Sequence, residues 1–172
     1  MKSYSPTIYT TNSDNSCRYV LGNDGTTPLV VIGLNPSKAD DKKPDRTITK
    51  VIGFARLFGC DSFIMINLYA QRTTQPNGLH ETLDVDLHCE NIAHITNILL
   101  ELKNPLILAS WGEVIRVRPY LKKCLSDIYE ITRKRDSTWL KIGVTKSGHP
   151  RHPSRAKYDQ LTDFDISNYL GK

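Results

Sequence analysis

Hydrophobic residues along the chain fall into two patterns that alternate. Four apolar runs, rich in β-branched residues, lack the polar–apolar alternation of half-exposed strands and are typical of strands buried on both faces. They predict strands at residues 28–37 (PLVVIGLNPS), 62–70 (SFIMINLYA), 105–112 (PLILASWG) and 137–145 (STWLKIGVT). Between these runs, apolar residues recur at spacings of three and four, as they do along one face of a helix.

The helical spacing is clearest at residues 47–59 and 84–102. Gly59 is placed to end the first helix, and Asp84 is a candidate N-cap for the second. A third, basic helix is expected after residue 112. Pro119 should lie in its first turn, because proline lacks the N–H group that a helix interior needs.

Strands that alternate with helices predict a parallel sheet covered on both faces. The fold class that we expect is α/β, a three-layer α/β/α sandwich with a central, mainly parallel four-stranded sheet. A short N-terminal strand or hairpin is expected at residues 17–25, where Asn-Asp-Gly has turn chemistry. The 172 residues fit one domain, 1–172, in which 1–15 form a loosely ordered N-terminal segment.

Polar residues follow each predicted strand. In parallel α/β sheets the ligand lies beyond the carboxyl ends of the strands, so the site can be placed from topology alone. These ends carry Asn35-Pro36-Ser37, Asn67 to Arg72, Trp111-Gly112 and the His-Pro loop of residues 149–155. We expect Asn35, Asn67, Trp111 and His152 to approach a single cleft.

The two asparagines offer carboxamides, which both donate and accept hydrogen bonds. Asn67 lies in an apolar strand, where a buried amide needs partners and would suit the edge of a nucleobase. A structural turn at Asn35-Pro36 and a structural hydrogen bond from Asn67 are the alternatives. Ser37 could offer its hydroxyl to an oxygen, and Arg72 could bind a phosphate through two hydrogen bonds.

The stretch His149-Pro150-Arg151-His152-Pro153-Ser154-Arg155 is the most distinctive in the chain. Two His-Pro units three residues apart exclude a helix, so the side chains project from a stiff loop. Such a loop could direct an imidazole and a guanidinium at an anion. An HxxH metal pair is less well supported, because no HExxH motif accompanies it. Asp40, Asp41 and Asp45 could bind a hard cation, although their lysine neighbours favour simple loop solvation.

Composition narrows the class of protein. There are 23 Lys and Arg against 18 Asp and Glu, and the excess lies in residues 116–135 and 141–157, which are expected to flank the cleft. A solvated basic face and phosphate contact both fit that excess.

The four cysteines have no metal or iron–sulfur spacing and are expected to be core thiols, so no cofactor or metal is predicted. No apolar run approaches the ~20 residues of a membrane span and no signal peptide is recognisable, so we expect a cytoplasmic protein.

Several motifs in fixed order resemble one family. RYVL, LNPSKAD, D-x-TI, GFARLFG, NLYAQR, WG and GVTKSGHPRHP are similar to the domain of unknown function 1643, over nearly the whole chain. That family implies no activity.

A remoter resemblance is to the uracil-DNA glycosylase superfamily. GLNPS resembles its first motif after strand one, INLYAQRTTQPNG resembles the segment after strand two of its thermostable branches, and HPSR resembles its late His-Pro-Ser motif. The resemblance implies that Asn35 holds the attacking water and Asn67 binds the base edge. It implies that His152 stabilises the departing base anion. Ser37 and Ser154 would contact flanking phosphates.

The departures from that superfamily bear on the chemistry. The iron–sulfur cysteines are absent, and no aromatic residue in 38–46 can stack on a base. Asn35 can orient water but cannot act as a base, so hydrolysis should be slow.

The function expected from the sequence is an N-glycosidase of the uracil-DNA glycosylase type, hydrolysing the N-glycosidic bond of an extruded or modified base. Its catalytic residues would be Asn35 and His152. The substrate-binding residues would be Pro36, Ser37, Asn67, Arg72, Trp111, His149, Ser154 and Arg155. The alternative is a non-catalytic module that binds nucleic acid or a nucleotide.

Overall fold

The computed structural model describes residues 4–172, which form one mixed seven-stranded sheet and four α-helices. The strands are β1 (Ile8–Thr11), β2 (Arg18–Gly22), β3 (Pro28–Gly33), β4 (Ser62–Asn67), β5 (Leu106–Ala109), β6 (Thr138–Lys141) and β7 (Thr162–Asp163). Their order across the sheet is β1-β2-β4-β3-β5-β6-β7. The helices are α1 (Arg46–Leu57), α2 (Val85–Leu100), α3 (Tyr120–Thr132) and α4 (Ile166–Leu170).

The middle of the sheet is parallel. β3 pairs with β4 on one side and with β5 on the other, and β5 pairs with β6, all in parallel. These are the four strands that the apolar runs predict, and β3 and β4 are buried along their whole length. Because Gly33 is in register with Asn67, the carboxyl ends of β3 and β4 lie side by side.

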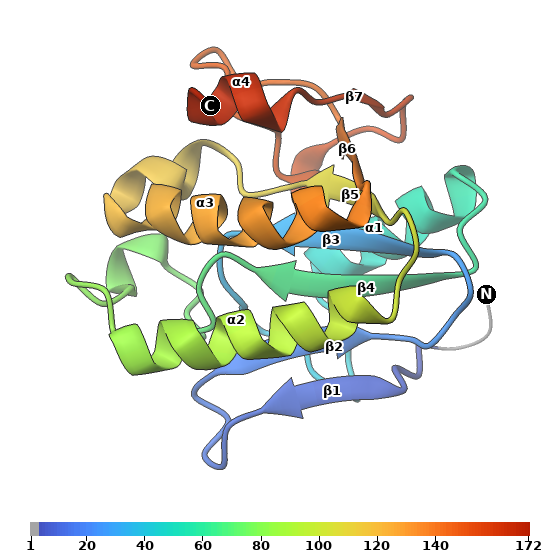
Figure 1. Ribbon diagram of the computed structural model, residues 1–172. Coiled ribbons are helices and arrows are strands. Elements are labelled where there is room, and N and C mark those ends of the chain that lie inside the picture. The colour runs from blue at the N-terminus through green and yellow to red at the C-terminus, as the bar shows by residue number, and fades with distance from the viewer. Residues whose placement is uncertain (1–3) are drawn as a thin grey trace.

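Helices cover both faces of the sheet (Figure 1). α1 packs through Ile48, Val51 and Phe54 on one face, with β-strand residues such as Val31 and Phe63. α2 and α3 pack on the other face in a second core, which includes Ile95, Leu125 and Ile128. Pro119 is the N-cap residue of α3, one position before the first turn in which it was expected, and its missing N–H group costs the helix no hydrogen bond there.

The sheet is wider than expected, because antiparallel strands extend both edges. β1 and β2 form the hairpin-like N-terminal pair, and β2 joins β4. We expected a loosely ordered segment over residues 1–15, whereas residues 8–11 form β1 and pair with β2; residues 1–3 lie outside the described residues. β7 pairs with β6 at the other edge, so the single α/β sheet is mixed.

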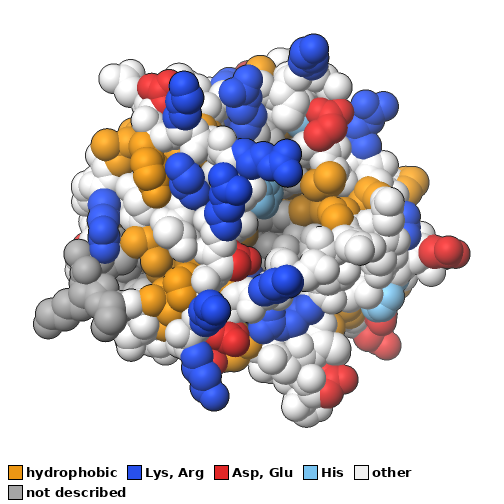
Figure 2. Space-filling view, turned by 180° about the vertical axis from the view of Figure 1, so that it is seen from behind, with side chains coloured by type: hydrophobic (Ala, Val, Ile, Leu, Met, Phe, Trp, Pro, Cys, Tyr) orange, Lys and Arg blue, Asp and Glu red, His pale blue; other side chains and the backbone are white. Residues whose placement is uncertain are grey.

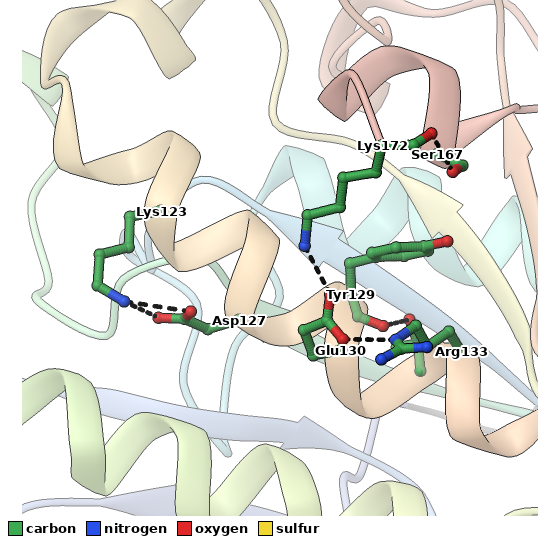
Figure 3. Close-up of polar contacts among 8 residues, drawn as sticks. Lys123, Asp127, Tyr129, Glu130, Arg133, Ser167 and Lys172 are labelled. Carbon is green, nitrogen blue, oxygen red and sulfur yellow. Dashed lines mark hydrogen bonds and ion pairs between the residues drawn. The ribbon is translucent and has the colours of Figure 1, made fainter.

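The C-terminal helix is tied to α3 by charged side chains (Figure 3). Lys172 Nζ donates to Glu130 Oε1 at 2.6 Å and lies 5.4 Å from the ring centre of Tyr129. Glu130 also accepts from Arg133 in the next turn. These contacts are partly exposed, so they position the end of the chain more than they stabilise the fold.

Three of the four cysteines lie in the core, as the sequence predicts. Cys17, Cys60 and Cys124 are buried as thiols and Cys89 is exposed. In residues 4–172, no helix has the length and apolar character needed to cross a membrane.

Candidate functional site

A cavity of about 180 Å³ lies at the carboxyl ends of β3 and β4, beside the first turn of α1. Strand ends, the loop after β4 and the His-Pro loop all contribute to its wall. The residues that line it are Arg18, Gly33, Leu34, Asn35, Ser37, Asp45, Thr47, Ile48, Met65, Thr73, Thr74, Pro76, Val114 and His152. Figure 2 shows this side of the molecule from behind the view of Figure 1, with Lys and Arg side chains gathered around a hollow that contains a histidine and an acidic side chain.

Asn67 lies beneath this cavity with both amide atoms unused. Its side chain is 0% exposed, and neither Oδ1 nor Nδ2 has a hydrogen-bond partner among the described residues. The amide lies over Gly33, which lines the cavity: a Cβ on Gly33 would be 2.8 Å from Asn67 Oδ1. Buried amides are almost always satisfied, so an orphan at a cavity is a candidate ligand-binding group.

Asn35 lines the cavity with a fixed orientation. Its Nδ2 donates to the carbonyl oxygens of Pro36 and Thr73, both at 2.9 Å. Because these partners can only accept, the amide oxygen of Asn35 is the atom left to bind a ligand. Pro36 is buried and accepts this hydrogen bond through its carbonyl oxygen, whereas Ser37 is half-buried and lines the cavity.

His152 enters the cavity as a neutral imidazole. Its Nδ1 accepts from the Ser154 N–H group, as the N-cap of a short 3₁₀ helix (Pro153–Arg155), and lies 2.9 Å from Ser154 Oγ. Burial lowers the pKa of His152 below its usual value, and the charge of Asp45 opposes that shift only in part. The proton of the neutral ring is therefore on Nε2, which is available to donate to a ligand.

Asp45 is a cavity residue that the sequence reasoning assigned to loop solvation. It is the N-cap of α1, where Oδ1 accepts from the Ile48 N–H group at 2.9 Å. The carboxylate also lines the cavity and is close enough to His152 to influence its pKa. The D-x-TI pattern was visible in the sequence as a helix start, and capping is the signal that separates Asp45 from Asp40 and Asp41.

Arg18 is a second residue that the sequence reasoning missed. It is 2% exposed, Nη1 donates to the Ala39 carbonyl oxygen at 2.8 Å, and Nε has no partner among the described residues. Burial and the neighbouring Arg72 charge lower the pKa of Arg18 to about 10, so the side chain remains a cation at neutral pH. A cation inside the apolar run CRYVLG was the available signal.

A wider groove of about 850 Å³ continues from the cavity. Thr74, Pro76, Val114 and His152 line both hollows. Further along, the groove is lined by the cations Arg151, Arg155 and Lys157, by Ser154, and by the acids Glu113 and Asp159. Ser154 and Arg155, two of the predicted binding residues, therefore line this groove and not the cavity.

One clamp holds the rim of the two hollows. Arg118, which follows β5, donates from Nη2 to the carbonyl oxygens of Asn77 and Leu79 at 2.7 and 2.9 Å. Its Nε donates to the His80 carbonyl oxygen at 2.9 Å. Arg118 thus joins the segments that carry Pro76 and Val114, and Tyr120 Oη donates to the same His80 carbonyl oxygen.

Five predicted site residues line neither hollow: Pro36, Asn67, Arg72, Trp111 and His149. Arg72 binds protein atoms instead of an open site: Nη1 donates to Ser37 O at 2.6 Å and to Ala39 O, and Nη2 donates to Tyr9 Oη. Trp111 is fully buried against Trp139, Phe164 and Tyr169, because its strand end turns it into the core of the α3 face. Its neighbour Gly112 lines the groove instead.

His149 also points elsewhere. Its Nδ1 lies 2.6 Å from Tyr169 Oη in α4, and the ring is buried. The expectation was that Asn35, Asn67, Trp111 and His152 share one cleft. Asn35 and His152 line the cavity, Asn67 lies behind its wall against Gly33, and Trp111 points into the core. Residues 116–135 do not flank the cavity as a whole, because α3 covers the opposite face of the sheet from α1. There, Lys123 pairs with Asp127.

Comparison with protein families gives one match. The family described as "Protein of unknown function (DUF1643)" matches residues 18–154. The chain belongs to this family. The matched part of this DUF1643 protein begins at Arg18 and ends at Ser154, so it includes every residue that lines the cavity. A comparison with curated proteins and another with solved structures each found no match.

Proposed function

We propose that this DUF1643 protein is an N-glycosidase of the uracil-DNA glycosylase type, which hydrolyses the N-glycosidic bond of an extruded or modified base. The observation that carries the proposal is the orphan amide of Asn67, which lies against Gly33 behind the wall of a cavity lined by Asp45 and a neutral His152. An amide that can donate and accept suits the edge of a nucleobase. A carboxylate and an imidazole N–H suit the two ends of the bond to be broken.

In the proposed reaction, the bond between the base nitrogen and the sugar carbon breaks and its electron pair leaves with the base. His152 Nε2–H donates to the oxygen of the base on which negative charge develops. The Asn35 amide oxygen and the Asp45 carboxylate orient a water molecule toward the sugar carbon. Water forms the new C–O bond and gives its proton to Asp45, leaving an abasic sugar and the base as an anion. The proton on Asp45 then returns to solvent, and the released base anion takes a proton from solvent.

Asp45 favours catalysis over simple binding. Asn35 cannot take a proton, so Asn35 and His152 alone would make a pocket without a base. Asp45 supplies a carboxylate in the same cavity, and only its Oδ1 is used by the helix cap. The other carboxylate oxygen is available for water.

Resemblance adds support for the type of glycosidase. Helices on both faces of a sheet with four central parallel strands are consistent with the three-layer sandwich of the uracil-DNA glycosylase superfamily. Asn35, Asn67 and His152 lie in the three segments whose sequence resembles motifs of that superfamily. This hydrolysis needs no cofactor or metal.

The experiment that tests the proposal compares Asp45→Asn with the parent protein. Asparagine is as good an N-cap as aspartate, so the variant should keep the stability of the parent to within about 0.5 kcal/mol. Loss of the Asp45 carboxylate, the proposed general base, should lower the rate of nucleobase release by roughly 100-fold or more. The readout is single-turnover cleavage, after alkali, of oligonucleotides that carry uracil, mismatches or modified bases, with melting temperature as the control.

Two results would contradict the proposal. Base release by Asp45→Asn at the parent rate would remove the carboxylate from the mechanism. Tight binding of the same oligonucleotides with no base release by the parent would support the alternative, a non-catalytic module that binds nucleic acid or a nucleotide.

A further inference from the structure

The buried guanidinium of Arg18 is not explained by the reaction above. No carboxylate among the described residues forms an ion pair with it, and its buried Nε has no hydrogen-bond partner there. A buried charge without a counter-ion is strongly unfavourable, so such a group in a cavity wall points to a missing anion. Arg18 is also part of the wall of the cavity itself.

The charges around Arg18 strengthen the case for a missing anion. Arg72 lies next to it, and both guanidinium groups donate to the same carbonyl oxygen, that of Ala39. Asp45 is the one acidic side chain in the cavity wall, and it attracts Arg18 without forming an ion pair with it. With His152 neutral, Arg18 and its neighbour Arg72 carry two positive charges, of which only Arg18 lines the cavity, and Asp45 carries one negative charge.

The size of the cavity indicates whether the missing anion is part of the bound ring or a phosphate. About 180 Å³ is well below the roughly 300–1,000 Å³ of pockets for drug-sized ligands, so the cavity has space for one small ring and not for a whole nucleotide. The basic residues Arg151 and Arg155 line the outer groove, which is the place for phosphates. Arg18 therefore faces the ring.

We propose that the cavity binds an acidic heterocycle, a base-like ring that carries its own carboxylate or other oxyanion, and that Arg18 binds this oxyanion. The inference rests on the proposed function for the ring being a nucleobase, and on the contacts of Arg18 for its charge. Asn67 would bind the ring edge and Arg18 the charged substituent, so the two residues together would set the specificity.

The test uses two free rings that differ by one carboxylate, uracil and 6-carboxyuracil (orotate), titrated calorimetrically into the full-length protein. Orotate should bind about tenfold more tightly or better, which is the gain of one charge-assisted hydrogen bond. Arg18→Gln should remove this preference, and Arg18→Lys should restore part of it. Arg133→Gln is the matched control, because Arg133 is exposed and pairs with Glu130 at the end of α3.

Further ligands locate the anion. Inorganic phosphate, and uridine against its 5′-monophosphate, should show no preference that depends on Arg18. If they show one, or if orotate and uracil bind equally or not at all, the inference is overturned. If Arg18→Gln fails to fold, the ratio of the orotate and uracil affinities of the parent protein still shows whether the cavity prefers a charged ring.

The outcomes also separate this inference from the proposed function. Binding of orotate through Arg18, with no base release from any oligonucleotide, would sustain the inference and reject the glycosidase. Base release from a neutral base without orotate preference would do the reverse.

Discussion

At the scale of single residues, the two histidines of the His-Pro loop have different surroundings. His152 lines the cavity with Nε2–H available, whereas His149 is hydrogen-bonded to Tyr169 and buried. They lie three residues apart, and each precedes a proline, so sequence position alone does not distinguish their roles. Their contacts do.

We expect His152→Ala to lower base release by roughly 100-fold, the effect of losing one preorganised donor to a developing anion. Equilibrium binding of the same oligonucleotide should change little, because the anion exists only along the reaction path. His149→Ala is the control and should retain base release, with a lower melting temperature. The two measurements are single-turnover base release and equilibrium binding. Equal loss of binding in both variants would make the loop a recognition element.

His152 should also make stability depend on pH. Its pKa is lower in the folded protein than the value of about 6.5 in an unfolded chain, so the unfolded state binds more protons near pH 6. The stabilisation is therefore complete above pH 6.5 and is lost as the pH falls through the folded-state pKa. We expect the unfolding free energy of the parent to fall more than that of His152→Gln between pH 7.5 and 5.5, measured by urea unfolding. Parallel pH profiles would contradict the expectation.

At the scale of elements, the segment between β3 and α1 depends on Arg72. The Ser37 and Ala39 carbonyl oxygens both accept from this guanidinium, which also reaches Tyr9 in β1. An arginine used in this way connects an edge strand to the cavity wall. Its role is structural, in contrast to the phosphate contact that the sequence predicted.

We expect Arg72→Met to lower the unfolding free energy by about 3 kcal/mol, because part-buried carbonyl groups would lose a charged donor. Arg155→Met, at an exposed position of the groove, should change it by less than about 0.5 kcal/mol. Urea unfolding of both variants supplies the comparison. A drop in oligonucleotide affinity for Arg72→Met without loss of stability would instead favour phosphate binding.

How far the sequence predicts these elements depends on burial. The four central strands and α1 to α3 follow from apolar runs and helical spacing, because their burial is recorded in residue type. β1 and β7 have little such pattern: Ile8–Thr11 is half-buried and Thr162–Asp163 is exposed. β1 and β7 form because their backbones pair with a neighbouring strand, and this pairing is a tertiary effect.

The site residues that the sequence predicts differ from those that it does not in what sets their position. Asn35, Asn67 and His152 stand at strand ends or in a stiff loop, where topology alone places them. Asp45 and Arg18 reach the cavity from a helix cap and from an antiparallel strand, and their roles depend on side-chain direction. Trp111 was misplaced because the direction of its side chain, into the core, is not given by its place after a strand.

At the scale of the whole molecule, the distribution of charge limits any contact with nucleic acid. The cations that line the groove are Arg151, Arg155 and Lys157, whereas Lys123 and Arg133 are paired with acids on α3. The net charge of +5 is therefore a poor guide to the number of phosphate contacts.

Binding of duplex DNA should weaken with salt with a log–log slope near −3, as expected for roughly three neutralised phosphates. Replacing Arg151, Arg155 and Lys157 by glutamine should bring the slope close to zero. The matched triple variant of Lys122, Lys123 and Lys134 should leave the slope unchanged. Fluorescence anisotropy at several salt concentrations gives the slopes. Equal slopes for the two triple variants would mean that contact is not confined to the groove.

The clamp formed by Arg118 has a consequence for how a substrate enters. Because one guanidinium holds the carbonyl groups of residues 77, 79 and 80, the mouth of the cavity is already set before a ligand arrives. A preformed mouth loses little conformational entropy on binding, so the main energetic barrier falls on the nucleic acid, whose base must leave its stack. For the proposed enzyme, the choice among target sites would then follow the local weakness of the double helix, and a frayed or mispaired position would be entered before a well-stacked one.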